Sequence, residues 1–198
     1  PLNKGIHFGN YRFDVHSQLD TVALRLEVLI GLLRVVLSIL AASFEDTETP
    51  EIKAKSYQAL SKLIETNLAQ LEEYYIDLTQ ILVKLTRQKE ESQVAGCIAF
   101  VRSIIEHYNR KLNIQPKVPN AAIDISFLQA TWLPLLGVLS TICGDHRQAV
   151  QNEAMSYLFE LLMEFGCLFK YEFWKMVFQG VIRPTFDEIL YTFQIRGS

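Results

Sequence analysis

The residues of this chain that could carry out acid, base or metal chemistry are few and scattered. The tightest group is Cys143, Asp145 and His146, which places a thiol, a carboxylate and an imidazole close together in the sequence. Asp145 with Gln148 three residues later is also the pattern of a helix capping box. We therefore expect Asp145 to cap a helix, Cys143 to face the core and His146 to lie exposed in the first turn.

A second candidate is the acidic run Glu72, Glu73 and Asp77, because paired carboxylates can act as general acid and base. Their spacing instead predicts a solvated helix face. The sequence has no phosphate-binding glycine loop, no dinucleotide fingerprint, no His-Glu-x-x-His motif and no paired cysteines at zinc-ligand spacing. We predict no catalytic residue, no bound metal and no cofactor.

A short basic run, Lys84, Arg87 and Lys89, is the candidate contact for a lipid headgroup or a partner protein. Glu90 and Glu91 follow directly, so charges of both signs are mixed here. Mixed charges are typical of an ordinary exposed helix face, and contact with a lipid is the alternative.

Composition excludes several classes of protein. The chain has 198 residues, of which 49% are hydrophobic and 21% charged, so it can bury a core and is not intrinsically disordered. Its formal net charge of −3 gives no general attraction to nucleic acid. Cys97, Cys143 and Cys167 are far apart, odd in number and set in apolar runs, which predicts reduced core thiols of a cytosolic protein.

Apolar residues recur at steps of three and four along most of the chain, which is the period of amphipathic helices. Between residues 51 and 95 we expect one break, near Ala69–Glu73 or near Arg87–Glu90. Helices joined by short turns recur about every 35–45 residues. This spacing predicts an all-α fold of antiparallel helix pairs stacked as a HEAT- or armadillo-like superhelical repeat; a compact helical bundle is the alternative.

The expected domain organisation follows from these helices. Residues 1–20 should form an N-terminal arm or loop, and residues 21–196 the helical-repeat domain. Its first half would be 21–113 and its second half 123–196. The chain begins without Met and ends in Gly197-Ser198, which predicts a fragment whose residues 197–198 are a cloning remnant.

Proline and glycine set the expected helix ends. Thr49-Pro50 predicts a helix start, and Gly166 predicts a helix end. Proline is tolerated in the first turn of a helix but not in its interior. We therefore expect Pro134 to follow a helix start near Thr131, and Pro184 to interrupt the last helix.

Aromatic residues are concentrated in the stretch from Phe165 to Phe178. The helical spacing of Trp174 and Phe178 predicts that both pack in the core. A partner-binding groove lined by aromatic residues is the alternative, because such residues dominate the energetics of interfaces.

The stretch from Trp132 to Asp187 carries a recognisable pattern of motif residues. They are Trp132, Asp145, Arg147, Val150, Gly166, Phe173, Trp174, Phe178, Pro184, Phe186 and Asp187. The pattern resembles the helical region downstream of the catalytic domain in the large brefeldin-A-inhibited Arf guanine-nucleotide exchange factors. It departs from that family at Gln151, where arginine is usual, and at Thr185, where an aliphatic residue is usual.

The resemblance implies a non-catalytic regulatory segment of such an exchange factor, with the catalytic module upstream and the motif residues structural. It implies GTP-loaded Arf-family GTPases, other domains of the same factor, or a second copy of the chain as partners, and no nucleic acid. It also implies a cytoplasmic location, peripheral at the Golgi and trans-Golgi network. The helices alone also fit a HEAT-like adaptor of another trafficking or nuclear complex.

Overall fold

The computed structural model describes residues 7–8, 11–12, 31–45, 49–115 and 123–196 of the chain. The chain divides into two compact units, Pro1–Ile39 and Leu40–Ser198. In the first unit, β1 (His7–Phe8) and β2 (Tyr11–Arg12) form a short antiparallel pair. Residues 31–45, the next that the structure describes, are helical, and the division between the two units falls within this stretch. Most of the predicted arm and the start of the predicted repeat domain lie outside the described residues.

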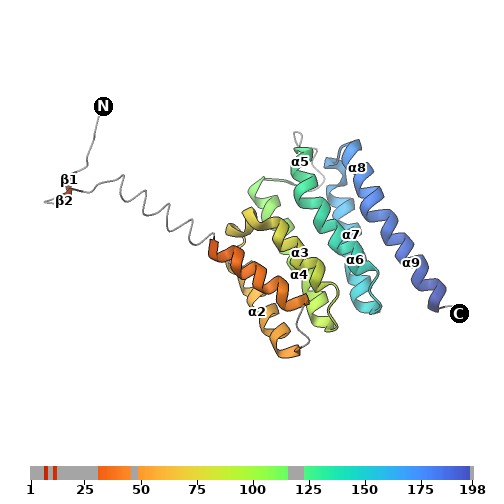
Figure 1. Ribbon diagram of the computed structural model, residues 1–198. Helices are drawn as coiled ribbons and strands as arrows, with labels where there is room; N and C mark the ends of the chain where they lie inside the picture. Colours follow the sequence, from red (N-terminus) through yellow and green to blue (C-terminus); the bar gives the residue numbers. More distant parts are fainter. Residues whose placement is uncertain (1–6, 9–10, 13–30, 46–48, 116–122, 197–198) are drawn as a thin grey trace. The chain divides into compact units, whose positions relative to one another are not determined.

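The second unit is built from helices that follow one another along the chain (Figure 1). Its elements are α2 (Pro50–Asn67), the 3₁₀ turn η1 (Gln70–Tyr74), α3 (Tyr75–Leu85), α4 (Glu91–Lys111), α5 (Ile125–Phe127), the π turn η2 (Leu128–Trp132), α6 (Leu133–Cys143), α7 (Gln148–Phe165), the 3₁₀ turn η3 (Gly166–Leu168), α8 (Tyr171–Val177), the π turn η4 (Phe178–Ile182) and α9 (Arg183–Arg196). As predicted, Thr49 is the N-cap of α2 with Pro50 at its start, and Gly166 is the C-cap of α7.

The helices pair in sequence order. The turn 86–90 joins α3 to α4 and the turn 144–147 joins α6 to α7, so each pair is antiparallel. The first helix of each pair contacts the first helix of the next, α3 with α6 and α6 with α9. The second helix of each pair likewise contacts the second helix of the next, α2 with α4 and α4 with α7. Two layers of helices result, which confirms the predicted all-α repeat of stacked antiparallel pairs.

Local sequence explains the ends of α2, α3 and α4. The chain breaks at both of the places considered, at η1 and again after Leu85. At the end of α4, Asn113 has a φ of 51°, a left-handed conformation that asparagine tolerates. The N–H groups of Asn113 and Ile114 then donate to the carbonyls of Arg110 and Asn109, so the last turn of α4 is capped by the backbone.

Aromatic rings fill the core of the second half. Trp132 is 1% exposed, and its ring meets Phe165 and Phe169 edge to face, with centroids 5.1 and 5.6 Å apart. Phe173 is fully buried against Phe169 at 4.8 Å. These edge contacts between rings add to the free energy of apolar burial.

The predicted burial of the cysteines holds for two of the three. Cys97 and Cys143 are buried as predicted, but Cys167 is exposed because it lies in the turn η3 and not on a buried helix face.

Among the described helices, Ile125–Cys143 has the length and apolar composition of a membrane span, with half of that stretch buried in the fold. Core helices of globular proteins share this composition, so it is weak evidence for a membrane segment.

Pro134 and Pro184 lie inside continuous helices and not at helix ends. Pro134 lies in the first turn of α6, as predicted, but η2 and α5 continue the helix back to Ile125. The predicted interruption at Pro184 is wrong, because η4 and α9 form one continuous helix. In each helix a π turn precedes the proline: Leu133 N–H donates to the Leu128 carbonyl and Arg183 N–H to the Phe178 carbonyl, five residues back. A widened turn gives the proline ring room beside the preceding carbonyls, and the helix continues.

The two π turns repeat the same external hydrogen bond. In η2 the carbonyl of Thr131 accepts from the hydroxyl of Tyr75 in α3. At the equivalent position in η4 the carbonyl of Val181 accepts from Ser140 Oγ of α6 at 3.1 Å. Thr185 Oγ1 also donates to Val181 O at 2.8 Å and lies 2.8 Å from Ser140 Oγ. Each hydroxyl comes from the preceding first helix, so a structural repeat exists where the sequence shows no identical one.

Ser140→Ala should lower the free energy of unfolding by about 1 kcal/mol, because a buried carbonyl loses a donor. Urea unfolding followed by circular dichroism measures the loss. Thr141→Ala is the matched control, since Thr141 is exposed and its hydroxyl donates to Gly137 O of its own helix; its effect should stay under about 0.5 kcal/mol. Equal losses in both variants would contradict a special role for Ser140.

Candidate functional site

The turns within the helix pairs meet at one edge of the second unit, and Arg147 joins them. We call residues 86–90 and 144–147 the turn edge. The Arg147 guanidinium binds Asp145 with two hydrogen bonds, Nε to Oδ1 at 2.8 Å and Nη2 to Oδ2 at 2.6 Å. Its remaining N–H groups donate to Lys89 O at 3.0 Å and Gln88 O at 3.3 Å. A planar guanidinium can satisfy all four acceptors at once, so Arg147 fixes one turn against the other.

The structure corrects the predicted capping box. The N-cap of α7 is Arg147, without a side-chain cap, and Asp145 Oδ1 instead accepts from the Arg147 backbone N–H at 2.8 Å. Asp145 therefore stabilises the turn before α7 and does not cap the helix, because the backbone N–H and the guanidinium of Arg147 bind its carboxylate. Gln151, one of the two departures from the family pattern, is buried and donates to Cys143 O at 2.8 Å.

Charge and burial act in opposite directions on Asp145. Burial disfavours its ionised form, but the hydrogen bonds and charge of Arg147 outweigh burial, so the pKa of Asp145 lies below its ordinary value. Both side chains are largely buried, at 7% exposed for Asp145 and 13% for Arg147. The ion pair is consequently shielded from solvent more than a surface pair would be.

Cys143 and His146 take no part in a chemical site with Asp145. Cys143 is buried, and burial raises the pKa of its thiol to about 12, so the reactive thiolate is absent at neutral pH. His146 is 84% exposed, as predicted, and its ring lies 3.5 Å from Asp145. Across the described part of the chain, no group of three or more His, Cys, Asp or Glu is arranged to hold a metal ion.

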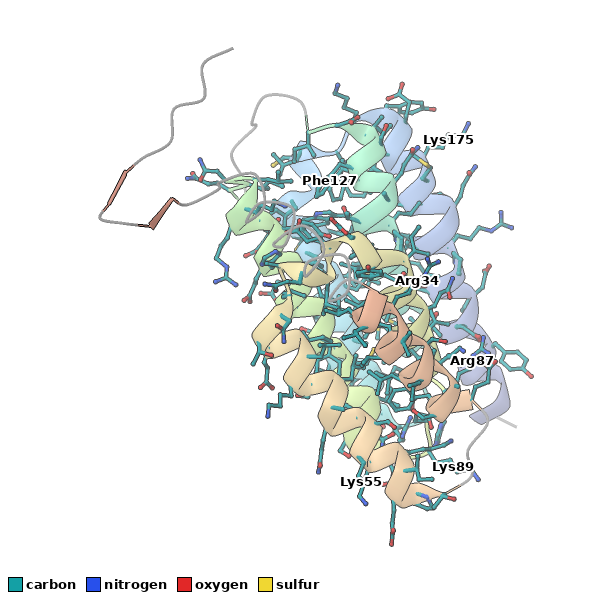
Figure 2. The ribbon with its side chains drawn as sticks, turned by 60° about the vertical axis from the view of Figure 1, so that its left-hand side comes forward. Arg34, Lys55, Arg87, Lys89, Phe127 and Lys175 are labelled. Atoms are coloured by element: carbon teal, nitrogen blue, oxygen red, sulfur yellow. The ribbon has the colours of Figure 1, made fainter. Side chains whose placement is uncertain are left out.

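The three basic candidates do not form one cluster. Lys84 is partly buried and binds the carboxylate of Glu45 and, at 3.4 Å, the carbonyl of Ala41. Arg87 and Lys89 are exposed at the surface (Figure 2). Lys84 thus ties α3 to the end of the helix formed by residues 31–45, and two cations remain for an external contact.

A hollow of about 300 Å³ lies beside the turn edge. Residues of both signs line it: Glu45, Pro50, Lys53, Gln88, Lys89, Glu90 and Gln93. Gln88 is buried and donates to Phe44 O at 3.1 Å and Lys84 O at 3.0 Å. Because its carboxylates balance its lysines, the hollow does not select an anion by charge alone.

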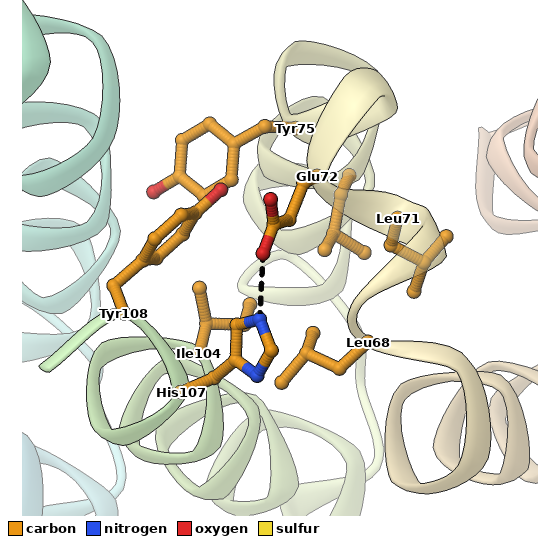
Figure 3. A pocket seen from close by; sticks show the side chains of 8 residues that line it. Leu68, Leu71, Glu72, Tyr75, Ile104, His107 and Tyr108 are labelled. Atoms are coloured by element: carbon orange, nitrogen blue, oxygen red, sulfur yellow. Dashed lines mark hydrogen bonds and ion pairs between the residues drawn. The ribbon is translucent and has the colours of Figure 1, made fainter. Parts of the chain in front are cut away.

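Glu72 was expected on a solvated face, and this expectation is wrong. One carboxylate oxygen of Glu72 lies 2.8 Å from His107 Nε2, a contact that Figure 3 shows. The other oxygen binds Lys111, four residues after His107 on α4. Although burial opposes ionisation, bonds to Lys111 and His107 lower the pKa of Glu72. Residues 35 positions apart meet here, so local spacing could not have revealed the contact.

The motif residues fall into three groups. Trp132, Val150 and Phe173 are core residues. Asp145, Arg147, Gly166 and Trp174 lie at joints between helices. Phe178, Pro184, Phe186 and Asp187 are exposed, so the core prediction for Phe178 is wrong. For these four exposed residues, a structural role stays a prediction.

Gly166 and Trp174 form the joint after α7. Trp174 is only partly buried, and its indole Nε1 donates to Gly166 O at 3.0 Å. A Cβ at position 166 would lie 2.6 Å from the indole ring. The close approach of the ring therefore requires glycine at position 166. The predicted burial of Trp174 in the core is wrong, because its indole lies at the edge of the fold and donates to a backbone carbonyl.

Fold and site together define a stacked helical-repeat protein whose polar groups mainly join helix to helix. Within that class, the chain is similar to three proteins of Arabidopsis thaliana. Brefeldin A-inhibited guanine nucleotide-exchange protein 4 is 27% identical over 143 residues, which is 64% of this chain and 8% of that protein. Protein 1 of the same name is 38% identical over 58 residues (29% and 3%), and protein 2 is 33% identical over 67 residues (34% and 4%).

The predicted resemblance to the brefeldin-A-inhibited exchange proteins is thereby confirmed. The chain spans less than a tenth of the length of these relatives. No protein-family model matches it, and no solved structure does.

Arg147→Lys should lower the free energy of unfolding by about 1–3 kcal/mol, because an ammonium cannot serve the carboxylate and both carbonyls together. Chemical denaturation measures the change. Arg102→Lys is the control: Arg102 lies 4.1 Å from the ring centroid of Tyr157, and lysine keeps that cation–π contact, so the cost should stay under about 1 kcal/mol. A loss at position 147 no larger than at 102 would contradict the joining role.

Stability should fall in acid partly through Asp145. Its pKa is lower folded than unfolded, so its contribution is present above the unfolded value, near 4, and disappears as the pH falls through the folded value. Asp145→Asn should therefore have a lower free energy of unfolding than the wild type at pH 7, and this difference should become smaller toward pH 2. Urea unfolding at a series of pH values measures the difference. A difference that does not change with pH would contradict a stabilising role of the ionised Asp145.

Proposed function

We propose that this chain is a non-catalytic regulatory segment of a large Arf guanine-nucleotide exchange factor. It mediates protein interaction and membrane recruitment in Golgi vesicle trafficking. The observation that carries the proposal is the similarity to three brefeldin A-inhibited guanine nucleotide-exchange proteins. In this proposal the catalytic module lies elsewhere in the polypeptide, and the chain works at the cytoplasmic face of the Golgi and trans-Golgi network.

The polar chemistry of the site supports a binding role. The side chains that could have formed a reactive centre are engaged in joining helices, as Asp145 and Glu72 are, or are held as an unreactive buried thiol, as Cys143 is. Stacked helix pairs also hold a broad surface in a fixed shape, which suits recognition of a folded partner. Possible partners are a GTP-loaded Arf-family GTPase, other domains of the same factor, and a second copy of the chain.

Recruitment through the GTPase is favoured over direct recruitment by lipid. Only Arg87 and Lys89 of the basic candidates extend from the surface, and Glu90 and Glu91 lie beside them. A polybasic lipid contact needs several unopposed cations near the bilayer. Flotation with vesicles that rises with anionic lipid content, and is lost in Arg87→Glu but kept in Lys55→Glu, would favour lipid instead.

The GTP-loaded GTPase should retain the chain about tenfold more strongly than the GDP-loaded form, a typical size of nucleotide-dependent coupling. Immobilised Arf-family proteins in each nucleotide state, incubated with the purified chain, provide the measurement. Targeting of a fluorescent fusion to the Golgi in cells is the second readout. Failure to bind either form, together with no Golgi targeting, would leave the HEAT-like adaptor of another complex as the better account.

A further inference from the structure

One side of α7 is apolar and uncovered in the described part of the chain. Met163 is 74% exposed, and Met155 and Phe159, on the same side at steps of four, are partly exposed. The opposite side of α7 is buried on α6 and α4. Methionine and phenylalanine together are typical of surfaces that receive a helix, because both side chains adapt to the shape of a partner.

The helix from α8 to α9 has a matching uncovered side. Phe178, Phe186 and Leu190 are 57%, 50% and 59% exposed. The rings of Phe159 and Phe186 lie 6.3 Å apart, so the two uncovered sides are continuous. We call Met155, Phe159, Met163, Phe178, Phe186 and Leu190 the α7/α9 face.

The repeat itself indicates what covers this face. Two of the second helices pack both on their own first helix and on the preceding second helix: α4 on α3 and α2, and α7 on α6 and α4. In the next repeat unit, a second helix placed in the same way would pack on α7 and on α8–α9, which is where the α7/α9 face lies. The first helix of that step, α8–α9, is present, and no described helix lies where its second helix would lie (Figure 1).

We propose that the α7/α9 face binds an amphipathic helix that runs antiparallel to α9 and is supplied by a longer form of the same polypeptide. The relatives offer the length for such a segment, because this chain spans only 3–8% of them. Its length should match α2, α4 and α7, which have 18, 21 and 18 residues. Its apolar residues should recur at steps of three and four. This proposal goes beyond the proposed function and holds whichever GTPase or adaptor partner binds elsewhere.

The three methionines of the chain provide the test. Met155 and Met163 belong to the α7/α9 face, whereas Met176 lies away from it and accepts from Gln129 Nε2 at 3.2 Å. The experiment compares oxidation of each methionine by dilute hydrogen peroxide in the 198-residue chain and in the full-length protein, with peptides quantified by mass spectrometry. Oxidation of Met163 should be about tenfold slower in the full-length protein, while Met176 should oxidise at the same rate in both.

Paired variants separate docking from a general change in stability. Phe186→Asp in the full-length protein should restore rapid oxidation of Met163. Tyr191→Asp, at an equally exposed position on another side of α9, should leave Met163 protected. Both side chains are at least half exposed, so neither variant should unfold the 198-residue chain, and circular dichroism checks this.

Two results would overturn the proposal. The first is equally fast oxidation of Met163 in the 198-residue chain and the full-length protein. The second is protection in the 198-residue chain that grows with concentration and accompanies a doubled mass in light scattering, which would make a second copy the occupant. Loss of GTPase binding with Met163 still protected would count against the proposed function alone.

Discussion

A helix with one apolar side is stable in water only when another helix covers that side. In this molecule α6 shows the constraint most fully, because it is covered by its own second helix, α7, and by the first helices on either side of it, α3 and α9. Trp132 shows the result: its ring is 1% exposed because α7 and the segment after it both close over it. The two layers, the short turns and the continuous core all follow from this requirement.

Close packing of helices leaves buried carbonyls that need donors, and the structure supplies them from neighbouring helices. Tyr75 and Ser140 each provide a hydroxyl to a carbonyl in a π turn, and Arg147 provides N–H groups to two carbonyls of another turn. These side chains join successive pairs at positions where apolar contact alone would leave polar groups unpaired. The same contacts therefore serve both solvation of the backbone and alignment of the repeat.

Sequence periodicity predicted the helices, the short turns and the stacked pairs, because apolar spacing is a local property read within one helix. It failed where a particular polar contact or an opposing helix decides the outcome. Pro134 and Pro184 were expected at helix ends, but π turns and hydroxyls from other helices allow the chain to continue. Asp145 was expected to cap a helix, but the guanidinium two residues later takes the carboxylate. Glu72 and Phe178 were misplaced because burial depends on which helix lies opposite.

The position of Cys167 has a practical consequence. Of the three thiols in the chain, two are sealed in the core, and Cys167 alone is exposed, directly after the glycine that meets the indole of Trp174. A maleimide dye should therefore attach at a single place without mutagenesis. Its emission would report on the surroundings of η3, the turn between α7 and α8.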